Sequence, residues 1–160
     1  NVSALAASAV TNLTVPANPI RYRMENLAVV SDSKENMTLF KQNIKKTGVG
    51  LPLNTLGDEV VLLAKAINKP KNAQMEKNLK TISSTYALLA ERTSKLSVPS
   101  EIADTHLELI NAYYGLSIAT AGLSLVYMDP VQSVQALSLH KSQTTKLLGA
   151  TKKMSAYLAK

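Results

Sequence analysis

Apolar residues recur at helical spacing along most of the chain, and the clearest run lies between residues 72 and 96. Its apolar positions alternate in steps of three and four residues: Met75, Leu79, Ile82, Tyr86, Leu89, Thr93 and Leu96. This spacing places one apolar stripe along one face of a helix. It predicts a helix from Asn72 to Leu96 whose stripe faces a bundle core.

The first helix is expected after the Asn18-Pro19 pair. An Asn cap followed by proline favours a helix start, because proline lacks only an N–H that the first turn leaves unpaired. The helix should run to about Lys46 and stop at Gly48. A break is expected at 29–33, where β-branched residues and serines cluster.

A second helix is expected to follow the turn-rich segment 48–54. Residues 55–58 resemble a capping box, and Pro70 should end or kink the helix. The apolar seam predicted for this helix consists of Leu56, Val60, Leu63 and Ile67.

Two further helices should form an antiparallel hairpin. Pro99 opens the first of them, and Asp129-Pro130 both closes it and caps the last helix. The short connection favours antiparallel packing. The charges agree with it, because acids near the start of one helix would meet lysines near the end of the other: Glu101, Asp104 and Glu108 with Lys146, Lys152, Lys153 and Lys160.

Composition supports an all-α fold. Apolar residues make up 46% of the 160 residues, with one Phe and no Trp, so the core must come mainly from aliphatic side chains that suit helix packing. We predict a four- to five-helix antiparallel bundle in one domain, residues 18–160. Residues 1–17 carry no charge and are expected to form an N-terminal extension.

Residues 109–128 form a run of twenty residues without a charged side chain. The run is long enough to span a bilayer, but its Asn, Ser, Thr and Tyr residues argue against spanning. A helix that is apolar nearly all round must instead be covered on all sides. The cover could come from the same chain or from another subunit.

Small side chains in this run would let a neighbouring helix approach closely. We predict that they form an assembly interface together with apolar residues of the N-terminal extension: Ala112, Gly115, Ala119, Gly122, Leu13 and Val15.

The sequence offers no recognisable catalytic or cofactor site. Without cysteine there are no thiolate ligands or nucleophiles. His106 and His140 are the only histidines and fit no metal motif. Asp104 and Glu108 near His106 are explained by the helix dipole. We therefore expect a protein that is not an enzyme, with no metal, no cofactor and no small-molecule substrate.

The net charge of +7 allows a second interpretation, a nucleic-acid-binding or coat-like protein. No acid follows Asp129, whereas five lysines do. The lysines are nevertheless dispersed over several predicted helices, and no DNA- or RNA-binding motif is present. A solvated basic surface is the preferred interpretation.

Three Asn-X-Ser/Thr triplets, at Asn1, Asn12 and Asn36, are potential glycosylation sites in an exported protein. The first residue is not Met, which we interpret as a sign of a processed product or an excised fragment. Both features favour an extracellular or cell-surface location.

The segment from Val98 to Tyr113 and the segment from Asp129 to Leu137 resemble uncharacterised helical proteins of ultra-small bacteria that are exported or membrane-anchored. The shared pattern is a Val-Pro helix start with His-Leu and Asn-Ala, followed by an Asp-Pro-capped helix. The resemblance implies the helical hairpin and brings no activity with it.

The hypothesis from sequence is thus an exported structural subunit. It would act by protein–protein association, with copies of itself, in a filament, pilus-like fibre or surface assembly.

Overall fold

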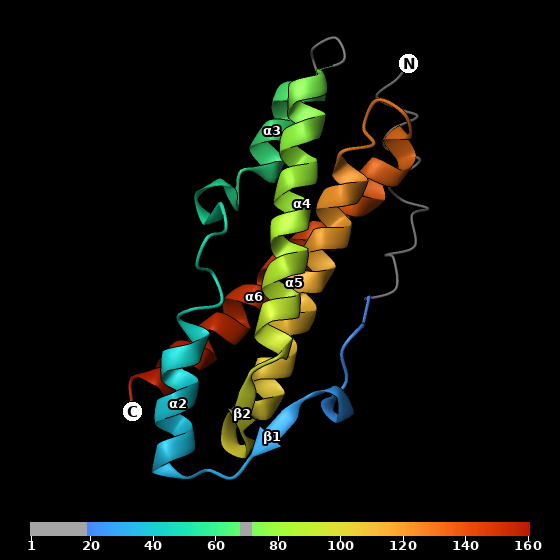
Figure 1. The fold of residues 1–160 in the computed structure, drawn as a ribbon. Coiled ribbons are helices and arrows are strands. Elements are labelled where there is room, and N and C mark those ends of the chain that lie inside the picture. Colours follow the sequence, from blue (N-terminus) through green and yellow to red (C-terminus); the bar gives the residue numbers. More distant parts are fainter. Residues whose placement is uncertain (1–18, 68–71) are drawn as a thin grey trace.

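Three long antiparallel helices form the frame of the protein (Figure 1). The computed structural model describes residues 19–67 and 72–160. The frame consists of α4 (Ala73–Ser94), α5 (Ala103–Leu123) and α6 (Pro130–Leu158), with α5 packed between the other two. The predicted all-α bundle is confirmed.

The starts predicted for two of the long helices are found in the structure, and a side chain caps each of them. Asn72 Oδ1 accepts the backbone N–H groups of Gln74 and Met75 at the start of α4. Asp129 Oδ1 accepts the N–H of Gln132 at 2.9 Å, and Pro130 opens α6. The predicted apolar stripe of α4 is buried except for its last member, Leu96, which is half-buried.

The α5–α6 hairpin brings the predicted opposite charges together. Lys153 Nζ lies 3.0 Å from Glu108 Oε2, and Lys160 pairs with Glu101. All four side chains are exposed, so solvent screens both ion pairs and each contributes little to stability. The pairs fit the register of the hairpin, while the buried α5–α6 contact holds it.

The prediction of a helix between Pro19 and the break at 29–33 is wrong. This segment contains a short 3-10 helix, η1 (Met24–Asn26), and a strand, β1 (Ala28–Val30), before α2 (Lys34–Ile44). β1 pairs in parallel with β2 (Ser97–Pro99), with Val29 opposite Val98. The β-branched residues favour this pairing. The break itself is confirmed, since Ser33 caps α2.

The second predicted helix starts later than expected, and the face that it buries differs from the predicted apolar seam. Thr55 lies in the 3-10 helix η2 (Leu53–Thr55), and its hydroxyl donates to the Pro52 carbonyl. The helix α3 spans Glu59–Ile67. Val60, predicted to be in the core, is 42% exposed, whereas Glu59 is completely buried. Packing against α4 and α5 decides this orientation.

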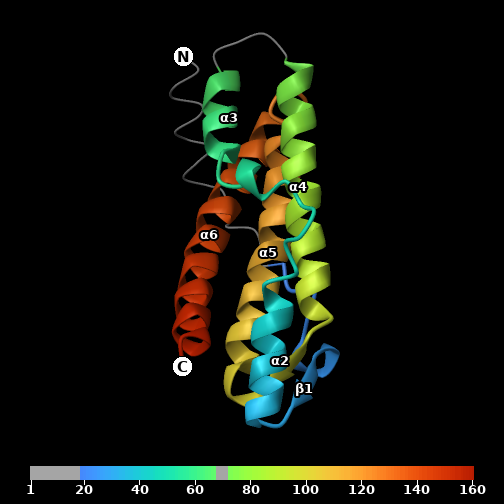
Figure 2. The ribbon, with the colours of Figure 1, turned by 60° about the vertical axis from the view of Figure 1, so that its left-hand side comes forward.

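The short helices cover opposite ends of the frame (Figure 2). α3 lies beside the first half of α4, whereas α2 lies near the chain end of α6. There Phe40 meets His106 and Tyr157 edge to face, with ring centroids 5.4 and 6.4 Å apart. The stretch that joins α2 to α3 is fixed on α4, because Arg92 donates to the Val49 carbonyl at 2.7 Å.

Candidate functional site

A groove of about 740 Å³ opens between α3 and α6. Its lining is mostly apolar, and α4 and α5 contribute Tyr86 and Leu116 to it. We call it the α3–α6 groove; the residues that line it are Gly57, Val60, Tyr86, Leu116, Val134, Leu137, Ser138, His140, Lys141, Thr144, Thr145 and Leu147.

Exposed apolar side chains on α6 continue the groove beyond both ends. The α6 row consists of Val131, Val134, Leu137 and Leu148, exposed by 54, 39, 37 and 66%. Spacings of three, three and eleven residues keep them on one side of the helix. From Val131 to Leu148 the row extends about 25 Å along the helix axis.

A buried polar cluster lies beside the groove. Glu59 of α3 is completely buried, and its Oε2 lies 3.6 Å from His140 Nε2 of α6. This distance suits an ion pair and is longer than a direct hydrogen bond. The Tyr86 hydroxyl of α4 and the Gly57 backbone also face the carboxylate. The cluster therefore connects three helices.

The surroundings of Glu59 decide its charge. Burial alone would raise the pKa of its carboxyl, but interactions with His140, the Glu59 and Gly57 backbone and Tyr86 lower it below the usual value. Burial and the neighbouring carboxylate raise the pKa of Tyr86. At neutral pH Glu59 is thus an anion, and the Tyr86 hydroxyl keeps its proton.

His140 also approaches Thr144, whose Oγ1 lies 3.5 Å from Nδ1. The sequence of acid, histidine and hydroxyl resembles the order needed to activate a nucleophile. Thr144 lies inside α6, however, where backbone N–H groups are already paired within the helix. The described residues thus offer no free backbone donors for an oxyanion beside Thr144.

The small residues predicted as an assembly interface lie inside the chain. Ala112 and Ala119 are buried, and a Cβ added to Gly115 would come within 2.6 Å of Gln143 on α6. A Cβ on Gly122 would lie 2.6 Å from the Cβ of Ala136, also on α6. The close neighbour of this stripe is therefore α6 of the same chain. Leu13 and Val15 lie outside the described residues.

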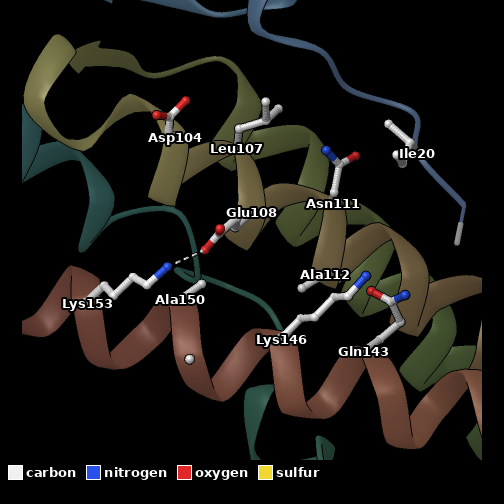
Figure 3. A pocket seen from close by; sticks show the side chains of 11 residues that line it. Ile20, Asp104, Leu107, Glu108, Asn111, Ala112, Gln143, Lys146, Ala150 and Lys153 are labelled. Atoms are coloured by element: carbon white, nitrogen blue, oxygen red, sulfur yellow. Dashed lines mark hydrogen bonds and ion pairs between the residues drawn. The ribbon is translucent and has the colours of Figure 1, made fainter.

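A second groove, of about 610 Å³, follows the opposite charges of the hairpin (Figure 3). Asp104 and Glu108 of α5 face Lys146 and Lys153 of α6 across it. Its lining mixes both signs of charge, which suits a stabilised helix contact better than a site for one ion.

Asn111 connects this second groove to the start of the described chain. Its amide oxygen accepts the Tyr22 N–H at 3.1 Å, and its amide nitrogen donates to the Tyr22 carbonyl at 2.9 Å. This two-way contact holds the segment with Ile20 along the groove (Figure 3).

His106 is separate from the acids around it in the sequence. It is completely buried, and Nε2 lies 3.0 Å from the Thr93 carbonyl oxygen. Burial lowers the pKa of His106 to about 4, despite the hydrogen bond to Thr93. His106 is therefore a neutral core residue at neutral pH.

Acid should destabilise the fold through His106. The unfolded side chain binds a proton near its usual pKa of about 6.5, and the folded one resists it. Stability should thus fall by up to about 1.4 kcal/mol per pH unit as the pH drops below about 6.5. Urea unfolding between pH 7 and 5 measures this slope. The variant H106Q should have a shallower slope, and equal slopes would contradict the assignment.

No helix within residues 19–67 and 72–160 has the length and apolarity to cross a membrane. No three His, Asp or Glu side chains gather as a metal site among these residues. Asn36 donates its side-chain amide to Ser31, whereas Asn1 and Asn12 lie outside the described residues.

No protein-family model, curated protein or solved structure matches this chain. The candidate site is therefore argued from its geometry.

Sequence reasoning did not find the cluster of Glu59, Tyr86 and His140. Glu59 lies four residues before the apolar Leu63, on the face of α3 that is buried. An acid in phase with an apolar face was the one available signal, and its partners come from distant parts of the chain.

Proposed function

We propose that this protein is a helical-bundle subunit that works by protein–protein association. Its α3–α6 groove receives the apolar face of a helix from a partner. Helices commonly bind in apolar grooves through residues spaced three or four positions apart.

The α6 row is the observation that carries this proposal. Single exposed apolar side chains are ordinary on protein surfaces, but several of them on the side of a helix that also lines an apolar groove indicate an interaction site. A groove of about 740 Å³ would also fit a small ligand. The row extends about 25 Å, which suits a helix of four to five turns better than a compact molecule.

The buried cluster supports the proposal by fixing the shape of the groove. Glu59 and His140 stand on the two helices that form its sides, and Tyr86 joins them to α4. A groove with fixed walls loses less conformational entropy on binding than a flexible one. The cluster thus preorganises the groove for binding.

Export and assembly into a fibre are further proposals, founded on the sequence features above. They are tested by light scattering and electron microscopy of the intact chain at low and high salt. Ordered oligomers that survive salt would support self-assembly. A salt-insensitive monomer would favour a partner other than a copy.

The groove proposal is tested with a single cysteine, which the cysteine-free chain allows. Ser138 lines the groove, and the variant S138C is labelled there with an environment-sensitive fluorophore. The variant S84C, labelled on α4, is the control. An amphipathic helical peptide is then titrated. We expect a blue shift for the S138C label alone. Equal responses at both positions, or none at S138C, would contradict the proposal.

A further inference from the structure

Two lysines lie on the same side of α6 as the α6 row. Lys141 lines the groove, and Lys152 follows Leu148 by about one turn. Both are exposed, and neither forms an ion pair with an acid among the described residues. The row is therefore apolar with two unneutralised positive charges.

Two of the other three lysines that follow Asp129 form ion pairs within the hairpin. Lys153 pairs with Glu108 and Lys160 pairs with Glu101, both acids of the segment that begins α5. No acid follows Asp129 in the sequence, so α6 offers Lys141 and Lys152 no negative neighbour in its own later turns. Both ammonium groups are therefore available to the carboxylates of a partner.

We infer that the occupant of the α3–α6 groove is an acidic amphipathic helix of another protein, and this inference rests on the proposed function. Its apolar face would cover the α6 row, and its carboxylates would lie opposite Lys141 and Lys152. These lysines are 11 residues apart, or about 16 Å along the axis. The matching carboxylates stand three helical turns apart.

A second copy of this chain fits the groove less well. Two α6 rows facing each other would bring lysines toward lysines, and each chain already carries a net charge of +7. Glu101 and Glu108, the acids beside α6, are already paired within the hairpin. Charge complementarity therefore selects a different, acidic chain.

The test uses two synthetic helical peptides with the same apolar face. One carries Glu at two flanking positions 11 residues apart, and the other carries Lys there. Binding to the full chain is followed by fluorescence anisotropy. We expect the Glu peptide to bind on the order of tenfold more tightly at low salt, with a smaller difference at high salt.

Reversing the charge of single lysines shows which of them is responsible for the preference for the Glu peptide. K141E should weaken binding of the Glu peptide and strengthen binding of the Lys peptide. K80E, on the exposed side of α4, should change the affinity for both peptides little and about equally. Equal binding of both peptides to the wild-type chain would overturn the inference. So would a K141E variant that behaves like K80E.

The outcome also separates this inference from the proposed function. If both peptides bind equally and L137E abolishes both, the groove is an interface without charge selection. If neither peptide binds, the groove proposal itself fails. If the chain alone forms oligomers that L137E dissociates, a second copy is the occupant and the acidic partner is excluded.

Discussion

Replacing Glu59 with alanine is expected to lower the free energy of unfolding by about 3 kcal/mol, because the buried polar groups that face its carboxylate lose their partner. His140 would lose its anionic neighbour, and Tyr86 would lose the carboxylate that lies near its hydroxyl. Urea unfolding at pH 7 measures the change.

The matched control is E35A. Glu35 also lies in the first turn of a helix, but it is exposed. Its loss should cost less than about 1 kcal/mol, the usual size of a charge–dipole interaction at the surface. Equal losses for E59A and E35A would show that the buried cluster does not stabilise the fold.

The pH dependence of Glu59 has a defined direction. Its folded pKa is lowered, so its contribution is complete above the usual carboxyl pKa of 4.5 and is lost as the pH falls below that value. The loss due to His106 begins at higher pH. The difference in free energy of unfolding between E59Q and the wild type, followed below pH 4.5, therefore measures the contribution of the Glu59 carboxylate.

Adding one methyl group at Gly122 is expected to lower stability by about 2 kcal/mol, since overpacking a tight contact commonly costs 1–3 kcal/mol. The new Cβ would lie 2.6 Å from Ala136 Cβ, so α5 and α6 would have to separate. The gain in helix propensity, about 1 kcal/mol, offsets only part of that cost.

Gly149 provides the control. It lies within α6, and a Cβ there meets nothing within 4 Å. G149A should therefore stabilise the protein by about 0.5–1 kcal/mol. Replacing Ala136 with glycine in the G122A chain should restore much of the loss, which a double-mutant cycle by thermal unfolding would detect. A G122A chain as stable as G149A would contradict the close helix contact.

Local sequence signals predicted the long helices well. The Asp129-Pro130 cap of α6 and the apolar stripe of α4 act over a few residues, so their pattern can be recognised in the sequence. The α5–α6 hairpin followed from a short connection. These features depend on neighbours along the chain.

Features that depend on distant contacts were missed. Val29 and Val98, which pair in the sheet, are 69 residues apart in the sequence, and no local pattern indicates that they pair. α3 has nine residues, too few for its apolar phase to be fixed without the helices it packs against. The small-residue stripe was recognised, but the sequence left open whether its neighbour is the same chain or another subunit, and the structure places α6 of the same chain against it.

The most direct test of the central claim compares two leucines of similar exposure. Leu137 lies in the groove and is 37% exposed, whereas Leu88 on α4 is 41% exposed. The affinity of the acidic helical peptide is measured for the wild type, L137E and L88E. An association site in the α3–α6 groove predicts at least about tenfold weaker binding for L137E alone, since central interface residues commonly contribute over 1 kcal/mol. Equal affinities for the two variants would contradict it.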